Sequence, residues 1–242
     1  MLRGLYRSAA GMLAQAATQD ALANNLANTH TSGFKRQIPT VTFSAVWQAQ
    51  VGERAAARRE RLITEYHTDF TQGELHRTEG ATDLALDGPD FFVVRTPQGE
   101  RLTRGGSFHV APSGELVDAS GAVLLGKAGP IRPGAGPWQI REDGTVLAAG
   151  QAVDQIRLAS RKPSGPPPER LGEALFVARD LTAAPPGETH VLQGWIEQPN
   201  LDPVREMVSM IAALRAYEMA QRAVTAQDET LERAINDVGR TR

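Results

Sequence analysis

Proline placement constrains this 242-residue chain more than any other feature. All 15 prolines lie from Pro39 to Pro203, so both ends lack the residue that most strongly breaks helices. Towards each end, selected positions follow alternating steps of three and four residues, which is the heptad spacing of a coiled coil. They are Leu5, Ala9, Met12, Ala16, Gln19, Ala23 and Leu26, and then Met207, Met210, Leu214, Tyr217, Gln221, Val224, Asp228, Leu231, Ile235 and Val238. We therefore predict a long helix at each end, the second beginning after a cap in Asn200-Leu201-Asp202-Pro203.

Many of these heptad positions carry alanine or methionine, so each helix alone has little apolar surface to bury and needs a partner. The two ends pair either within one chain or between chains, and the sequence leaves both arrangements open. Gln19, Gln221 and Asp228 occupy heptad positions where apolar residues would be more stable. Such polar residues either fix the register and the number of partners or face solvent at the edge of the seam.

An asparagine cluster marks the end of the first predicted helix. Asn24, Asn25 and Asn28 fall within five residues and precede Gly33 and Phe34. Asparagine competes for backbone hydrogen bonds and tolerates left-handed backbone conformations, so the cluster predicts a helix terminus and a shaped turn that Phe34 anchors. An asparagine-rich helix terminus without any function remains the alternative interpretation.

The middle of the chain has the pattern of an antiparallel β structure. Short apolar runs over residues 83–126 alternate with Gly-, Pro- and Asp-containing turns, and similar runs continue to Ile196. Residues 162–168 predict a proline-rich surface loop, and residues 45–61 predict a short helix or an arm that orders on contact. The expected fold is α+β, with long coiled-coil-forming terminal helices flanking a central antiparallel β-rich domain. The expected divisions are 1–44, a linker or arm over 45–75, a β-rich domain over 76–198, and 199–242.

Composition excludes several classes of protein. The chain has no cysteine, so it contains neither disulfides nor thiolate metal sites, and its net charge of −2 argues against bulk binding of nucleic acid. No apolar run reaches the roughly 18 residues of a membrane span. The first twenty residues lack the continuous apolar segment of a cleaved secretory signal, so we expect none.

Catalytic patterns are weak. The histidines are dispersed, and the motifs of nucleotide binding and of nucleophilic hydrolases are missing. Glu65, His67 and Asp69 would share one strand face and form a weak candidate for metal or acid–base chemistry. We therefore expect no enzyme activity and no catalytic, cofactor or metal residue. A glycan-acting enzyme that uses Glu65 and Asp69 is the unfavoured alternative.

Five segments together resemble the axial family of bacterial flagellar rod and hook proteins. They are LYRSAAGMLAQ, NNLANTHTSGFK, DLALDGPDFFVV, RLTRGGSFHVAPSGELVDASGAVLLG and QGWIEQPNLDPVREMVSMIAALRAYEMAQRAV. The resemblance covers most of the chain. Within the family, LYRSAAGMLAQ and IREDGTV favour the proximal rod subunit over the distal rod or hook-type sibling.

The resemblance implies a structural subunit of the basal-body rod in the periplasm, exported through the flagellar type III apparatus without a cleaved signal. It also implies helical polymerisation through the terminal helices, with itself and with other rod or hook proteins as partners. The polymer would transmit motor torque and enclose the export channel, without nucleic acid, membrane insertion or cofactor. The residues that we expect to carry assembly are Leu5, Met12, Asn24, Asn25, Leu26, Asn28, Gly33, Phe34, Lys35, Met210, Leu214, Tyr217, Val224 and Leu231.

Overall fold

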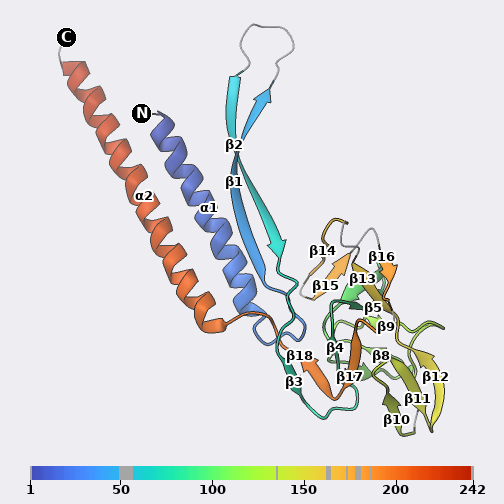
Figure 1. Cartoon of the computed structure of the whole chain (residues 1–242). Coiled ribbons are helices and arrows are strands. Elements are labelled where there is room, and N and C mark those ends of the chain that lie inside the picture. Colours follow the sequence, from blue (N-terminus) through green and yellow to red (C-terminus); the bar gives the residue numbers. More distant parts are fainter. Residues whose placement is uncertain are drawn as a thin grey trace. The chain divides into compact units, whose positions relative to one another are not determined.

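The computed structural model describes residues 2–48, 57–134, 136–161, 165–172, 174–177, 181–185 and 187–240. Figure 1 follows the chain from α1 (Leu2–Ala27) through a succession of strands to α2 (Pro203–Arg240). The residues divide into two compact units. The helix unit contains residues 1–27, 37–69 and 202–242, and the β unit contains residues 28–36 and 70–201. The predicted α+β fold with helices at both ends is confirmed.

The two helices of the helix unit pack against each other within one chain and run in opposite directions (Figure 1). The two ends of the chain therefore pair with each other within one chain. Asp202 caps α2 as predicted: its carboxylate accepts hydrogen bonds from the backbone N–H of Val204 at 2.9 Å and of Arg205 at 3.3 Å. Pro203 occupies the first helical position, where its missing N–H costs nothing.

The stripe of α2 that faces α1 differs in part from the predicted seam. Buried and half-buried positions recur at heptad spacing, at Glu206, Met210, Ala213, Tyr217, Ala220, Val224, Gln227 and Leu231. The predicted positions Met207, Leu214, Gln221, Asp228 and Ile235 are instead exposed. Hydrophobicity alone predicts that methionine and leucine lie at the helix contact. Packing on an alanine-rich helix instead places the small side chains of Ala213 and Ala220 there. Of the three polar heptad positions, Gln221 and Asp228 face solvent within this chain, whereas Gln19 is half-buried.

The predicted seam of α1 is also shifted. Its most buried side chains are Ala10, Ala21, Leu22 and Asn25, while Ala23 is exposed. Met12, Ala16, Gln19 and Leu26 are half-buried. The buried face of α1 is therefore rotated relative to the heptad positions that the sequence favoured.

A long antiparallel hairpin completes the helix unit. Strands β1 (Gln37–Gln48) and β2 (Ala57–Thr68) pair in register from Gln37 opposite Thr68 to Gln48 opposite Ala57. The alternative of a short helix is thus wrong at 45–48 and 57–61, and residues 49–56 lie outside the described part. Alanine, arginine and glutamine give this segment high helix propensity, but pairing with a partner strand overrides local propensity.

The β unit is built around one large antiparallel sheet, whose strands follow the order β14-β15-β6-β5-β9-β8-β7, with β13 bridging β5 and β16. Three smaller sheets, β10-β11-β12, β17-β4 and β18-β3, complete it. The strands are β3 (Leu75–Arg77), β4 (Leu84–Asp87), β5 (Phe91–Thr96), β6 (Gly99–Thr103), β7 (His109–Val110), β8 (Leu116–Val117), β9 (Val123–Leu124), β10 (Trp138–Ile140), β11 (Thr145–Ala148), β12 (Gln151–Gln155), β13 (Leu158–Arg161), β14 (Glu169–Arg170), β15 (Leu175–Val177), β16 (Leu181–Ala183), β17 (His190–Gln193) and β18 (Trp195–Glu197).

Strand β5 explains why the β unit holds two hydrophobic clusters. Successive side chains of a strand point to opposite faces of the sheet. Phe92 and Val94 join the larger cluster, with Leu84, Leu124 and others, whereas Phe91 and Val93 join the smaller one around Phe176. The sheet is therefore covered on both faces, which accounts for the unbroken apolar sequence FFVV.

Candidate assembly site

Asn25 joins three elements of the helix unit through its side-chain amide. Its Nδ2 donates to the carbonyl of Gln37 at 2.9 Å and to Oε2 of Glu206 at 3.1 Å, while its Oδ1 accepts from the backbone N–H of Gln37 at 2.9 Å. Asn25 and Glu206 are both buried. We call this group the asparagine clamp, and it fixes the end of α1 against the start of β1 and the first turn of α2. The Glu206 carboxylate is also favoured there by the positive end of the helix dipole.

The predicted turn after α1 has the expected form. The Thr31 hydroxyl donates to Oδ1 of Asn28 at 3.0 Å, and the Thr31 N–H donates to the carbonyl of Asn28 at 3.1 Å. Phe34 is fully buried, and the Arg170 guanidinium lies 4.4 Å from its ring centroid. Burial lowers the pKa of Arg170 to about 10.

Gly33 is required in this turn for two reasons. Its φ of 68° lies in the left-handed region that other residues rarely adopt. A Cβ at this position would also lie only 2.1 Å from the backbone carbon of Arg104. The close approach lets the Gly33 N–H donate to the carbonyl of Glu197 at 2.7 Å, so the turn is attached to the end of β18.

A buried charged cluster fixes the same turn inside the β unit. Lys35 Nζ lies 2.5 Å from Glu197 Oε1, and Arg104 Nη1 lies 3.1 Å from Glu197 Oε2. The Lys35 ammonium also donates to the carbonyl of Thr71 at 2.7 Å, and the Gly73 N–H donates to the Glu197 carboxylate at 2.9 Å. We call these groups the Glu197 cluster. All three charged side chains are at most 2% exposed.

The Glu197 cluster lies where the chain enters and leaves the β unit. Lys35, Thr71 and Glu197 come from three separate segments, each within six residues of a boundary of that unit. Burial lowers the pKa of the Arg104 guanidinium, and the nearby carboxylates of Glu197 and Asp90 oppose this shift. Removing one partner from a buried ion pair is strongly destabilising, so the cluster acts as a single anchor for the three segments.

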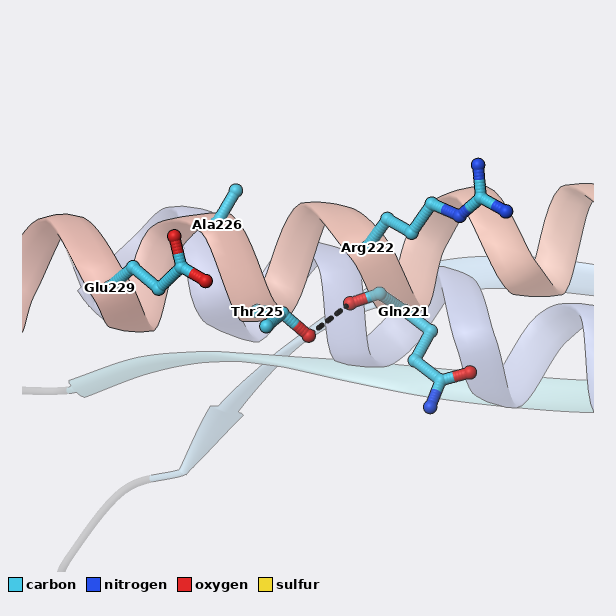
Figure 2. A pocket seen from close by; sticks show the side chains of 5 residues that line it. All are labelled: Gln221, Arg222, Thr225, Ala226 and Glu229. Atoms are coloured by element: carbon cyan, nitrogen blue, oxygen red, sulfur yellow. Dashed lines mark hydrogen bonds between the residues drawn. The ribbon is translucent and has the colours of Figure 1, made fainter.

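The side of α2 that faces away from α1 is apolar in its first three turns. The large side chains there are between 44% and 64% exposed: Val204, Met207, Val208, Ile211 and Leu214. Met219 is also exposed beyond them, and further along the same side lies a shallow depression lined by Gln221, Arg222, Thr225, Ala226 and Glu229. Figure 2 shows Arg222 extending away from the helix and the Thr225 hydroxyl donating to the carbonyl of Gln221 at 3.2 Å.

The predicted assembly residues differ in where they lie and in how deeply they are buried. Asn25, Asn28, Gly33, Phe34 and Lys35 are buried in the asparagine clamp, in the turn or in the Glu197 cluster, while Asn24 is exposed and Leu26 half-buried. Met210, Tyr217, Val224 and Leu231 are half-buried on the α1-facing side of α2, and Met12 is half-buried on α1. Leu214 is exposed. Leu5 lies in α1, and its side chain is outside the described part.

Sequence reasoning missed Glu197, Arg104 and Glu206. Each is a charged residue, and only the neighbouring residues in its segment follow the apolar pattern. Periodicity of apolar residues cannot detect a buried charge, because the signal that it measures is absent at that position. The one available signal was that all three lie inside the segments that carry the family resemblance.

The weak catalytic candidates do not form a site. Glu65 and His67 are exposed on β2, with Oε2 and Nε2 3.9 Å apart. Within the described residues, no group of three or more histidine, aspartate or glutamate side chains could hold a metal ion. In that same part of the chain, neither helix combines the length and the apolar character that crossing a membrane requires.

A terminal helix pair in which α2 exposes apolar side chains over residues 204–214, together with a β unit that has its own core, indicates the class of structural assembly subunits. Three family models match in order along the chain. They are Flagella basal body rod protein at residues 5–35, Flagellar hook protein FlgE/F/G D1 domain at 85–148, and Flagellar basal body rod FlgEFG protein C-terminal at 192–237.

Relatives cover nearly the whole chain. The flagellar basal-body rod protein FlgF of Caulobacter vibrioides is 32% identical over 91% of both chains. FlgF of Salmonella typhimurium is 31% identical over 94% of this chain and 95% of its own. FlgG of Buchnera aphidicola subsp. Schizaphis graminum is 29% identical over 96% and 98%. This chain belongs to the flagellar basal-body rod protein family and is a non-enzymatic structural subunit of that rod. Because the relatives include both FlgF and FlgG, the proximal position stays a prediction.

Proposed function

We propose that this subunit polymerises helically through its terminal helices, with itself and with other rod proteins. The resulting tube forms part of the drive shaft that transmits motor torque and encloses the export channel. The observation that carries the proposal is the distribution of exposed apolar side chains. Of the 13 large apolar side chains that are exposed in the described part, seven lie on α2. Water-exposed apolar surface concentrated on one helix favours contact with further subunits.

The assembly core in this proposal comprises residues 1–44 and 199–242, with residues 45–75 as an arm and residues 76–198 as the outer domain. Within the core, Leu5, Met12, Met210, Leu214, Tyr217, Val224 and Leu231 act as packing residues. The turn from Asn24 to Lys35 then sets the direction in which the chain leaves α1. The asparagine clamp supports this role, because it ties that exit to the first turn of α2.

The proposed location is the periplasmic part of the basal body. Family membership supports export of the chain through the flagellar type III apparatus, as the resemblance implies. The segments LYRSAAGMLAQ and IREDGTV favour the proximal rod position. Crosslinking in isolated basal bodies would identify the neighbouring rod proteins and so distinguish proximal from distal placement.

Truncation of α2 tests the assembly proposal. A chain that ends at residue 214 loses Tyr217, Val224 and Leu231 from the helix contact but keeps the whole β unit. We expect this variant to retain the β signal in circular dichroism and to be absent from purified hook–basal bodies. The full-length chain expressed in the same strain is the control. Recovery of normal rods that contain the truncated chain would contradict the proposal.

A further inference from the structure

The hairpin of β14 and β15 supplies one arginine to the turn that follows α1. Arg170 of β14 lies opposite Phe176 of β15, and Phe176 also pairs with Leu102 of β6. The Phe176 side chain is fully buried in the smaller hydrophobic cluster. The hairpin is therefore attached to the central sheet of the β unit, and Arg170 reaches the turn from a fixed base.

The Arg170 guanidinium contacts two aromatic rings and the backbone of the turn. Its central carbon lies 4.4 Å from the ring centroid of Phe34 and 5.3 Å from that of Phe176. Its Nη2 donates to the carbonyl of Lys35. The attraction between a cation and an aromatic face grows as water is removed, and burial lowers the pKa of Arg170 only to about 10. The side chain stays protonated at neutral pH, so one cation holds both a ring and a peptide of the turn.

A groove of about 630 Å³ separates other parts of the same two elements. Its lining includes Thr31 and Ser32 from the turn and Leu171 and Leu175 from the hairpin. Side chains that line an open groove lack packing partners on that side. The contacts of Arg170 therefore attach the hairpin to the turn next to a region where the two elements do not pack together.

Family membership does not assign a role to this arginine. The three family models match residues 5–35, 85–148 and 192–237. The turn residues Gly33, Phe34 and Lys35 lie inside the first of these ranges, whereas Arg170 lies outside all three. A turn that belongs to the matched part of the chain is thus held by a side chain from a part that the models do not match.

We propose that Arg170 is a positioning residue for assembly, which holds the turn at Phe34 and Lys35 in the geometry that incorporation into the rod requires. The inference rests on the proposed function, because that function gives this turn a part in assembly. A guanidinium can stack on a ring and donate to a carbonyl at the same time, whereas the ammonium of lysine is compact and strongly hydrated. Lysine would therefore replace Arg170 if charge alone were needed, but not if stacking is needed.

Hydrogen exchange of the purified full-length chain measures whether Arg170 holds the turn. The backbone N–H groups of Gly33 and Phe34 both donate to carbonyls of the β unit, at 2.7 and 3.2 Å. We expect Arg170→Lys and Arg170→Met each to accelerate exchange at these two groups by about tenfold, because the turn opens locally more often.

The matched control is Ile131→Val, which removes one methylene from the larger hydrophobic cluster. This change lowers the overall stability of the β unit by an amount similar to the loss of one cation–aromatic contact, but it leaves Arg170 in place. Exchange at Gly33 and Phe34 should then stay within about twofold of the wild-type rate, since local opening of the turn does not expose Ile131.

A second ring variant tests whether stacking is the reason that lysine fails. Phe34→Leu keeps an apolar side chain in the turn but removes the aromatic face. In this background the further change Arg170→Lys should alter exchange at the same two N–H groups by less than about twofold, because two changes in one contact are not additive. A tenfold acceleration that persists without the ring would contradict the stacking role.

Incorporation into the rod shows whether the held turn matters for assembly. Each variant replaces the wild-type chain in the source bacterium, and the amount of chain in purified hook–basal bodies is measured. We expect Arg170→Lys and Arg170→Met to lower this amount by at least about fivefold, because fewer chains have the required turn geometry. Ile131→Val should leave the amount within about twofold of wild type, which a role in stability alone would not allow.

Three results would overturn the inference. They are wild-type exchange and incorporation with Arg170→Lys, equal effects of Arg170→Met and Ile131→Val, and normal incorporation of Arg170→Met. Absence of the wild-type chain from hook–basal bodies would instead refute the proposed function, so the two failures are distinguishable.

Discussion

The two units of this protein use apolar residues in opposite ways. The β unit covers both faces of its central strand β5, and Phe92, Leu84 and Leu124 are completely buried. The helix unit buries mostly alanines between α1 and α2 and leaves Ile211 and Val208 more than half exposed. Burial of apolar surface is the main favourable contribution to folding. The β unit therefore has its own source of stability, whereas stability of the helix unit depends more on contacts that further subunits supply.

Buried polar groups show a related difference. In the helix unit the asparagine clamp consists of one side-chain amide, the N–H and the carbonyl of one backbone residue, and one carboxylate. In the β unit the Glu197 cluster holds two cations on one carboxylate, away from water. Loss of a partner costs more where charges are left uncompensated. We therefore expect substitutions in the Glu197 cluster to lower the free energy of unfolding more than substitutions in the asparagine clamp.

The largest expected effect is loss of the Phe92 ring from the β unit. Phe92→Ala leaves a cavity in the larger cluster, next to the ring of Phe108, whose centroid is 5.7 Å away. Such substitutions cost about 3–5 kcal/mol of the free energy of unfolding. Chemical denaturation followed by tryptophan fluorescence measures this loss. The matched change on the helix unit, Ile211→Ala, should cost less than about 1 kcal/mol in the isolated chain, and equal costs would remove the contrast between the units.

Glu197→Gln should give the next largest effect, because it removes the carboxylate that pairs with both Lys35 and Arg104. We expect a loss of about 3 kcal/mol or more in the free energy of unfolding. Hydrogen exchange should accelerate at the backbone N–H groups of Gly33 and Gly73, since both are held at Glu197. Glu115→Gln is the control, since its partner Arg132 is exposed. A variant Glu197→Gln with wild-type stability would mean that the cluster is not an anchor.

Structural features could be predicted from the sequence where the residues of a single segment determine them. The β unit was recognisable because apolar runs and turn residues alternate along it. The Asn28-to-Phe34 turn was recognisable because asparagine and glycine have distinct backbone preferences. The rotation of the helix contact could not be recognised from sequence, because Ala213 and Ala220 have little hydrophobicity yet permit close approach of the two helices. The burial of Glu197 and Glu206 could not be recognised either, since a buried carboxylate is stabilised by partners that come from distant segments.

Asn25→Ala should have an intermediate effect on the helix unit. It removes both hydrogen bonds to Gln37 and leaves the buried Glu206 carboxylate with one donor fewer. An unsatisfied buried polar group costs about 1–3 kcal/mol. Thermal unfolding followed by the helix signal in circular dichroism is the appropriate measurement. Asn236→Ala makes the same change at an exposed position of α2 and should not lower stability by more than about 0.5 kcal/mol, so equal losses at both positions would contradict the importance of the clamp.

The smallest expected effect depends on pH and belongs to the β unit alone. A hydrogen bond from the Thr145 N–H, at 2.9 Å, lowers the pKa of the Asp143 carboxyl in the turn before β11. A carboxyl whose pKa is lower in the folded chain binds protons more readily when unfolded, so its contribution is present at neutral pH and is lost as pH falls through the folded pKa. Because the group is exposed, Asp143→Asn should cost only about a few tenths of a kcal/mol at pH 7 and less near pH 2. Denaturation curves at both pH values test this, and a cost that stays constant between them would show that the charge contributes nothing.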